Sequence, residues 1–334
     1  MLEVVKNMIM KHRSDSLKLQ GIEAALRRLP SLHPQQPYLI RQFKQITAGI
    51  VGEEQLNKLF SRVTFQFDYF VFHDLHLKST ASFQMDSLFL TPYYAIIIEM
   101  KNIAGHIKIR KDHPQLQRTL STGQVDYYKN PVGQIVEITD VFEDFLQMHN
   151  VKLPIYQVIL FKDANRLLEF DEKNIPIFGI QELPHFIRTR PRENISLNPP
   201  KMKKLIQTLR EKHHDFMPFP IANHYSIDSK DIVTGIRCDS CEAFSVEKMF
   251  RGWICSKCGK ETKTAHLAAL NDYAMLLSNK ITNKEFRRFL QLENTKQASD
   301  ILRKMKLSVS GCKKKREYML EYQNEKMSNC IKNC

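Results

Sequence analysis

One stretch of the chain, residues 83–102, decides how the sequence is interpreted: FQMDSLFLTPYYAIIIEMKN. Two strand-like apolar runs flank the segment Thr91–Tyr94, which predicts an antiparallel hairpin with a tight turn. Pro92 suits the second position of a type I turn. If the hairpin is symmetric about the bond after Pro92, the numbers of opposed residues sum to 185, and Asp86 lies opposite Glu99.

This register places three charged side chains on one face of the predicted sheet. Opposed residues of an antiparallel pair project from the same face, with Cβ atoms roughly 4.5–5.5 Å apart. Lys101 lies two residues beyond Glu99 on the same strand and therefore shares that face. The apolar residues expected on the same face are Leu88, Leu90 and Ile97. Two carboxylates and one ammonium group should thus converge at the end of an apolar sheet.

Asp86, Glu99 and Lys101 together suit metal-assisted chemistry. Adjacent carboxylates repel one another, and burial raises their pKa, so a divalent cation relieves both costs. Oxygen ligands on a hard cation that keeps some waters suit Mg²⁺ or Mn²⁺. Lys101 would lie near a metal-bound water or a phosphate oxygen. This equipment suits hydrolysis of a phosphodiester.

A surface ion pair between Glu99 and Lys101 is the competing interpretation, because the pattern Glu-x-Lys is common by chance. Against it, Glu99 ends the apolar run Ala95–Ile98, where a charge is costly without a partner. The segment Gly49-x-x-Gly52-Glu53 also opens a predicted helix with another acid. The residues alone leave both interpretations open.

The region from about Gly49 to Ile138 resembles the NERD, or nuclease-related, domain of the PD-(D/E)xK nuclease superfamily. The matching pieces, in order, are Gly49-Ile50-Val51-Gly52-Glu53, the Asp86 strand with Leu90-Thr91-Pro92, Ile98-Glu99-Met100-Lys101-Asn102, Gly105, and Asn130-Pro131-x-x-Gln134. They cover about a quarter of the chain. Met100 departs from the small aliphatic residue more usual there. The resemblance adds the following expectations about fold and site.

The resemblance implies an α/β fold, a restriction-endonuclease-like mixed sheet flanked by helices. It implies that Asp86 and Glu99 are metal ligands, with the carbonyl of Met100, and that Lys101 orients or activates water. Glu53 would approach from its helix as a further acid, and Gln134 would contact substrate or water. The intact acidic set favours an active enzyme. The nearby residues His73, Asp74 and His76 receive no role and are expected to be structural or surface residues.

Two C-x-x-C pairs predict a zinc site. Cys238, Cys241, Cys255 and Cys258 can present four thiolates to one tetrahedral Zn²⁺. Four sulfur ligands leave no open position, so this zinc would be structural. The segment resembles a zinc ribbon, a module that docks nucleic acid or protein, and the residues do not distinguish the two. Cys312, Cys330 and Cys334 have no ligand-like spacing, and the alternative for the pairs is buried or redox-active cysteine.

Two short helices are expected near the C-terminal end. Thr282 lies three residues before Glu285, a capping-box start, and 295–305 predicts a second helix after a short link. This favours a helix-turn-helix whose second helix could enter a major groove, with an ordinary helical bundle as the equal alternative. The basic residues expected to contact nucleic-acid phosphates are Lys296, Arg303, Lys304, Lys306, Lys313, Lys314, Lys315 and Arg316.

The net charge favours a polyanionic partner. The chain of 334 residues has 50 Lys and Arg against 36 Asp and Glu, a net charge of +14. Residues 231–334 carry 20 basic and 12 acidic residues, so they hold more than half of the excess. Nucleic acid is the first expectation and an anionic membrane surface the second. Solubility alone is the alternative explanation.

The predicted organisation is an N-terminal helical segment (1–40), a nuclease-like domain (41–225), a zinc ribbon (232–264) and a basic helical module (265–334). The segment up to about residue 33 is expected to form two short helices, and 266–322 to be mostly helical. Within the nuclease-like domain, the expected strands are Phe65–His73, Gln84–Leu90, Ala95–Lys101, Ile155–Phe161 and Ile175–Ile180, with helices around Gly52–Phe60, from Pro131, and over Lys201–His213. Since no apolar run is long enough to cross a bilayer, we expect a soluble, cytoplasmic protein.

The sequence therefore predicts a nuclease that uses Mg²⁺ or Mn²⁺ to cleave DNA, as an endo- or exodeoxyribonuclease, with a structural Zn²⁺. The alternative is a non-catalytic nucleic-acid-binding or regulatory protein on a nuclease scaffold. RNA is the weaker expectation for the substrate, and no membrane partner is expected. The zinc ribbon leaves room for a protein partner, and the oligomeric state stays open.

Overall fold

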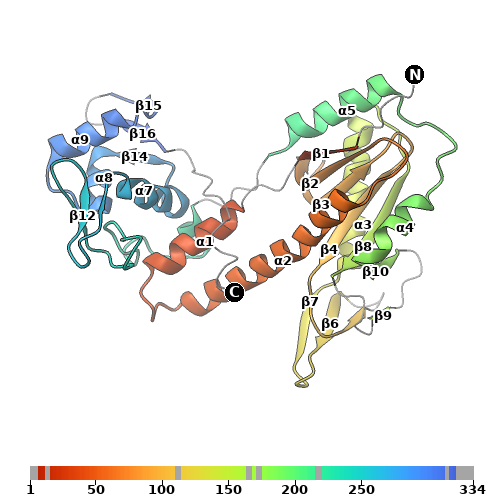
Figure 1. Ribbon diagram of the computed structural model, residues 1–334, viewed down its shortest axis with the longest axis horizontal. Coiled ribbons are helices and arrows are strands. Elements are labelled where there is room, and N and C mark those ends of the chain that lie inside the picture. The colour runs from red at the N-terminus through yellow and green to blue at the C-terminus, as the bar shows by residue number, and fades with distance from the viewer. Residues whose placement is uncertain are drawn as a thin grey trace. The chain divides into compact units, whose positions relative to one another are not determined.

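A computed structural model describes residues 7–11, 16–109, 114–162, 168–170, 175–214, 220–312 and 316–320 (Figure 1). The chain forms two compact units. The first, here called the sheet unit, comprises residues 1–14 and 47–215. The second, here called the cysteine unit, comprises residues 15–46 and 216–334. The N-terminal residues are thus shared between the two units, which the sequence did not indicate.

The sheet unit is built on a six-stranded mixed sheet in the order β1-β2-β3-β4-β8-β10. Its strands are β1 (Asn7–Lys11), β2 (Tyr69–Lys78), β3 (Ser82–Leu90), β4 (Ala95–Lys101), β8 (Ile155–Phe161) and β10 (Ile177–Gly179). Strands β2, β3 and β4 form an antiparallel meander, whereas β4, β8 and β10 run parallel. This is the mixed α/β sheet that the sequence predicted.

Helices cover both faces of this sheet because its central strands are apolar on both sides. One face packs against α3 (Pro131–Met148) and α5 (Pro199–Lys212), through residues such as Phe142 and Leu205. The other packs against the second half of α2 (Gln36–Arg62) and against α4 (Leu183–Arg188), which follows the short helix η1 (Ile180–Glu182) (Figure 1). Asn130 caps α3 and Pro131 occupies its first turn, as expected from the sequence.

A second, four-stranded sheet in the same unit has the order β7-β6-β5-β9. Its strands are β5 (His106–Ile109), β6 (Gln115–Thr119), β7 (Val125–Lys129) and β9 (Leu168–Phe170). Figure 1 shows the β6–β7 hairpin extending past the end of the main sheet. Strand β7 leads directly into α3 and so connects this small sheet to the helix that covers the main one.

The register of the central hairpin is the predicted one. The paired residues of β3 and β4 run from Ser87↔Ile98 to Leu90↔Ala95, and the numbers of each pair sum to 185. Thr91 organises the turn through its side chain, since its hydroxyl accepts the amides of Tyr93 and Tyr94 at 3.1 and 3.0 Å. The amide of Thr91 also donates to the carbonyl of Tyr94 at 2.9 Å, so side chain and backbone close the turn together.

The cysteine unit surrounds a core formed by residues from the whole unit, including Ile22, Trp253 and Phe289. Its elements before the cysteines are α1 (Leu17–Arg28), the first part of α2, and α6 (Ile221–His224). Its small ribbon sheet comprises β11 (Val246–Lys248), β12 (Trp253–Cys255) and β13 (Glu261–Thr262). The remaining elements are α7 (Ala265–Leu276), β14 (Lys280–Thr282), α8 (Asn283–Leu290), α9 (Thr295–Lys304), β15 (Val309–Ser310) and β16 (Glu317–Met319).

One prediction of secondary structure was wrong and one was incomplete. The described part of the first predicted helix is strand β1, which pairs in parallel with β2. The C-terminal region is mostly helical, as predicted, through α7, α8 and α9, but β14, β16 and β15 also form an antiparallel sheet. Strand β1 adopts the extended form because a partner strand distant in sequence satisfies its backbone.

The helix-turn-helix expectation concerns α8 and α9. The capping box of Thr282 and Glu285 is present, and Gln291 ends α8 in the left-handed conformation with φ 56°. Asn294 caps α9, so only a short link separates the two helices. Among the described residues, no helix is both apolar and long enough to cross a bilayer.

Candidate functional site

Asp86, Glu99 and Lys101 lie where β3 and β4 stop pairing with one another. The register continues past Ser87↔Ile98 toward Asp86 and Glu99, on the sheet face that carries Leu88 and Ile97. Glu99 is only 2% exposed, whereas Asp86 and Lys101 are half-buried. This burial argues against a surface ion pair, because a charged carboxylate at such a position needs specific partners.

Lys101 is the centre of a hydrogen-bonded group. Its Nζ donates to Glu99 Oε1 at 2.5 Å and to Gln134 Oε1 at 3.2 Å. Gln134 belongs to the first turn of α3, which the Asn130 cap and Pro131 fix at the end of the sheet. The structure therefore brings together Glu99, Lys101 and Gln134 from two elements far apart in sequence.

Asp86 is held by the backbone of the neighbouring strand. Its Oδ2 accepts the amide of Met100 at 2.9 Å. The carboxylate thus replaces a backbone carbonyl at the point where β3 and β4 separate. This contact fixes one carboxylate oxygen of Asp86 beside the backbone of the Glu99 strand and so orients the group.

The electrostatics of the group follow from its burial. Burial, followed by the negative charge of Asp86, raises the pKa of Glu99 to about 7, although Lys101 opposes this rise. Burial lowers the pKa of Lys101, but the carboxylates of Glu99, Asp86 and Glu53 together raise it above its ordinary value. Glu99 therefore binds a proton more readily than a free carboxyl group does, while Lys101 stays charged.

Glu53 approaches this group from α2. Its charge acts on Lys101, as the raised pKa of that lysine records. The helix passes close to the end of β4, because a Cβ on Gly52 would come within 2.6 Å of the Cβ of Asn102. The side chain of Asn102 donates to the carbonyl of Ala48 at 2.7 Å and joins strand to helix.

The donor set fits a hard divalent cation. Asp86 and Glu99 offer carboxylate oxygens, and the raised pKa of Glu99 indicates a site where a cation would relieve repulsion between the two acids. Two side-chain ligands and open positions are typical of Mg²⁺ or Mn²⁺, which keep waters. Among the described residues, three or more His, Cys, Asp or Glu ligand atoms come together only at the four cysteines. A cation at Asp86 and Glu99 would therefore complete its coordination with backbone oxygen, water and substrate.

The three polar residues of β2 that received no role have protein partners. His73 is fully buried and its Nδ1 lies 2.7 Å from Ser87 Oγ. Asp74 Oδ1 lies 3.1 Å from His76 Nε2 and accepts from Gln84 at 2.8 Å. These contacts describe a polar network along β2 and β3 and agree with a structural role.

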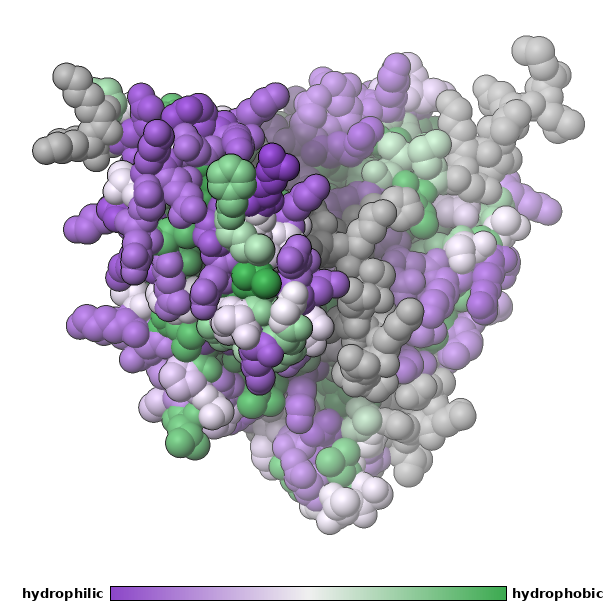
Figure 2. All heavy atoms as spheres, turned by 60° about the vertical axis from the view of Figure 1, so that its left-hand side comes forward, coloured by the Kyte–Doolittle hydropathy of each residue, from purple (hydrophilic) through white to green (hydrophobic). Residues whose placement is uncertain are grey.

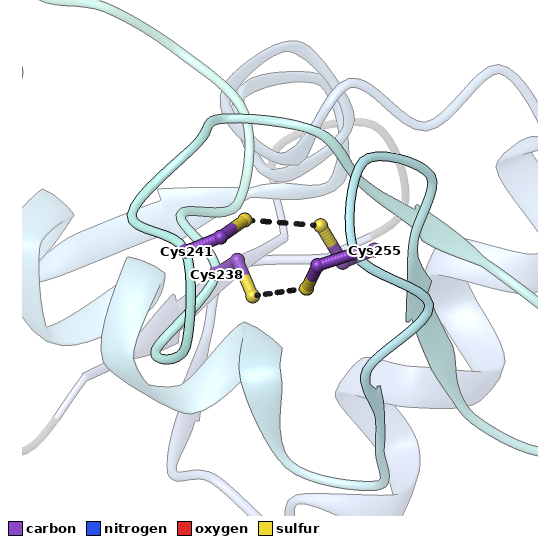
Figure 3. Close-up of side chains that lie close together, drawn as sticks. Cys238, Cys241 and Cys255 are labelled. Atoms are coloured by element: carbon purple, nitrogen blue, oxygen red, sulfur yellow. Dashed lines mark hydrogen bonds between the residues drawn. The ribbon is translucent and has the colours of Figure 1, made fainter.

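The four predicted zinc ligands converge (Figure 3). The sulfur atoms of Cys238, Cys241, Cys255 and Cys258 all lie within 4.8 Å of one another. Cys238 Sγ is 3.7 Å from Cys258 Sγ, and Cys241 Sγ is 3.6 Å from Cys255 Sγ. This cluster can hold a zinc ion with a complete set of four ligands.

Two thiols of the cluster differ in how readily they bind a proton. A hydrogen bond from the Ser245 hydroxyl is the main cause that lowers the pKa of Cys255 to about 6. The amide of Lys260 lowers the pKa of Cys258, but burial and the other sulfurs outweigh it and raise that pKa to about 12. The Cys255 thiolate therefore forms readily while Cys258 holds its proton, and a bound metal ion would displace that proton.

The basic residues proposed for phosphate contacts lie on the surface of the cysteine unit. Lys296, Arg303 and Lys304 are exposed on α9, and Lys306 is exposed just beyond it. Arg316 is exposed beside β16, whereas Lys313, Lys314 and Lys315 lie outside the described residues, as do Cys330 and Cys334. Figure 2 shows a mostly hydrophilic surface on the side of this unit that faces the viewer.

Comparison with protein families agrees with the fold. Residues 48–162 match the family model described as nuclease-related domain, NERD. The chain contains a NERD domain. This domain begins in α2 before Glu53 and ends just after β8, so it includes Asp86, Glu99, Lys101 and Gln134. The resemblance seen in the sequence is confirmed, and the comparisons with curated proteins and with solved structures gave no match.

Sequence reasoning missed several contacts that organise the NERD site. It did not foresee that the Met100 amide binds Asp86, or that Asn102 ties the strand to Ala48. The signal for Asn102 was its place directly after Lys101 in the matching motif. The backbone contact had no sequence signal, because any residue supplies an amide.

Proposed function

We propose that the protein is a Mg²⁺- or Mn²⁺-dependent nuclease that hydrolyses phosphodiester bonds in DNA. The observation that carries the proposal is the buried Glu99 with the half-buried Asp86 near it and a charged Lys101 beside it, inside a nuclease-related domain. A scaffold kept only for binding would have no need to maintain two mutually repelling carboxyl groups in an apolar sheet.

In this proposal Asp86 and Glu99 hold the divalent cation, together with the carbonyl of Met100. The cation, when bound, lowers the pKa of a water and offsets charge on the phosphate. Lys101 orients the attacking water or contacts a phosphate oxygen, and Gln134 holds the ammonium group in place. Glu53 adds negative charge from α2, which keeps Lys101 protonated.

The cysteine unit is proposed to hold the nucleic acid. A structural Zn²⁺ at the four cysteines would stabilise the ribbon, and α9 would present its basic residues to phosphates, as the second helix of a helix-turn-helix. Such contacts give salt-dependent affinity with little sequence preference. DNA is proposed over RNA because this arrangement suits the wide major groove of a DNA duplex.

The test is cleavage by purified full-length protein of plasmid, linear duplex, single-stranded DNA and RNA with Mg²⁺ or Mn²⁺. Asp86→Asn should reduce DNA cleavage by about 100-fold or more, because metal-assisted steps contribute several kcal/mol. DNA affinity should stay within about threefold, since the cysteine unit is unchanged. Asp126→Asn, which alters a half-buried acid paired with Arg118 on the small sheet, is the matched control.

Cleavage by Asp86→Asn at the wild-type rate would contradict the proposed site. Wild-type protein that retains DNA but never cuts it, with every metal and substrate, would favour the competing function. That function is a non-catalytic nucleic-acid-binding or regulatory protein on a nuclease scaffold. Cleavage of RNA alone would change the substrate class. A cytoplasmic location belongs to the proposal and is testable by fractionation.

A further inference from the structure

The hairpin between β11 and β12 carries an exposed aromatic side chain. Phe250 is 93% exposed and lies two residues after Lys248, the last residue of the ribbon strand β11. Its neighbours Met249 and Arg251 are exposed as well. Burial of a phenylalanine ring stabilises a protein by about 1.5–3 kcal/mol. The exposed ring of Phe250 contributes none of this stabilisation to the isolated chain.

Hydrogen bonds and a cation–π contact hold the turn of the hairpin that carries Phe250. The Lys248 ammonium donates to the carbonyls of Met249 and Gly252, and it lies 5.4 Å from the centre of the Trp253 ring. The amide of Met249 also donates to the carbonyl of Gly252 at 2.9 Å. Because the turn is held by these contacts, Phe250 is presented outward by an ordered backbone.

Two cations and one acid lie near the exposed ring. Arg251 lies 5.8 Å from the centre of the Phe250 ring. Arg251, Lys263 and Glu261 line an open hollow of about 560 Å³ beside Phe250, together with Trp253. Lys304, at the end of α9, is close enough to Lys248 to contribute to the lowering of its pKa, after burial. Lys248, at the base of the hairpin, therefore lies near the basic residue Lys304 of α9 in the same unit.

An exposed aromatic ring with arginine and lysine beside it matches one ligand class in particular. Nucleobases stack on aromatic side chains, and nearby cations bind the phosphates that follow each base. A protein partner of low charge would have to desolvate Arg251 and Lys263 without compensation. The charges therefore favour a polyanion whose bases are available for stacking.

We infer that the ribbon hairpin is a binding site for an unpaired nucleobase, which stacks on Phe250 while Arg251 and Lys263 contact the adjoining phosphates. This site gives the protein a preference for DNA with single-stranded segments next to the duplex held by α9. The inference deepens the proposed function but depends on binding and not on cleavage.

The experiment measures binding of zinc-loaded, full-length protein to fluorescein-labelled oligonucleotides by anisotropy, with no Mg²⁺ or Mn²⁺ added. The probes are a 20-nucleotide single strand, the matching blunt duplex, and that duplex with a single-stranded overhang. Phe250→Ala should weaken binding of the single strand by about 5- to 100-fold, in line with the loss of one stacked base. Binding of the blunt duplex should change by less than about twofold.

Two variants serve as controls. Leu32→Ala removes another side chain of the same unit that is 95% exposed, and it should leave binding unchanged. Phe250→Trp keeps an aromatic face and should retain the affinity for the single strand. In addition, 2-aminopurine placed in the overhang should lose fluorescence on binding to wild-type protein but not to Phe250→Ala, because stacking quenches it.

Equal binding of the single strand by wild type and Phe250→Ala would overturn the inference. A loss of the same size on the blunt duplex would also overturn it, since the effect would not concern unpaired bases. Retention of DNA binding by Phe250→Ala with loss of a co-purifying protein would assign the hairpin to a protein partner instead. The cleavage test of Asp86→Asn is independent, so either proposal can fail without the other.

Discussion

Glu99 is the residue whose environment most directly reflects the proposed chemistry. Folding buries its carboxyl group and places Asp86 beside it, so the pKa rises to about 7 from an ordinary value of 4.5. Lys101 then donates to Glu99 Oε1, and Gln134 accepts from the same ammonium group. A site of this kind stores unfavourable electrostatic energy in the metal-free protein, which a bound cation would release.

Glu99 should make the stability of the metal-free protein depend on pH. Its folded-state pKa is raised, so between about pH 4.5 and 7 the folded state binds more protons than the unfolded chain. The free energy of unfolding should therefore fall as pH rises through this window. The shift corresponds to roughly 3 kcal/mol at most, at about 1.4 kcal/mol per pKa unit.

Urea unfolding between pH 4 and 8 in the absence of divalent cations measures this effect. Glu99→Gln should flatten the profile and unfold at higher urea than wild type near pH 8. Glu137→Gln, which alters an acid of α3 with a 74% exposed side chain, should follow the wild-type profile. An identical slope for Glu99→Gln and wild type would contradict the assignment of the raised pKa.

At the scale of elements, the contact between α2 and the end of β4 determines where Glu53 lies. Gly52 is needed there because the backbone of the helix passes so close to Asn102. Glycine weakens a helix interior, so its presence in the middle of α2 indicates a packing requirement. The same helix carries Gly49, where the nearest atom to an added Cβ is a Glu53 oxygen 4.0 Å away.

These two glycines give a matched pair of substitutions. Gly52→Ala should destabilise the protein by about 1–3 kcal/mol, because the new methyl group would force α2 away from Asn102. Gly49→Ala should stabilise it by roughly 0.5–1 kcal/mol through helix propensity. Urea midpoints and the rate of DNA cleavage check both. Equal effects of the two substitutions would mean that the close approach does not exist in solution.

At the scale of the whole molecule, the sheet unit and the cysteine unit have separate hydrophobic cores. The core of the cysteine unit includes Cys238, Cys255 and the single tryptophan, Trp253, which is buried and donates to His266 at 3.1 Å. Burial and the charge of Lys248 lower the pKa of His266 to about 4, so this ring accepts as a neutral imidazole. A metal at the cysteines would therefore stabilise one unit far more than the other.

Removal of zinc should unfold the ribbon and leave the sheet unit intact. A strong zinc chelator should shift the Trp253 emission to longer wavelength and move only one of two transitions in calorimetry, since separate cores need not unfold together. Cys238→Ser should reproduce the effect, while Cys312→Ser, which changes an exposed cysteine outside the cluster, should not. Unchanged Trp253 emission after chelation would contradict a zinc-stabilised ribbon.

The sequence by itself determined those features that depend on local pattern. Strands β4 and β8, the start of α3 and the caps of α8 follow from periodicity, proline position and side-chain caps. The symmetric turn set the register of β3 and β4 and so the common face of Asp86 and Glu99. The spacing of the two C-x-x-C pairs likewise predicted that four sulfurs would meet.

Only the tertiary structure decided the features that depend on partners distant in sequence. Strand β1, which was predicted as a helix, is extended because β2 supplies its hydrogen bonds across about 60 residues of chain. The binding of Asp86 by the Met100 amide, the contact of Gln134 with Lys101 and the approach of α2 to Asn102 arise from packing between elements. Such contacts depend on how apolar faces fit together in three dimensions, and no pattern of neighbouring residues encodes that fit.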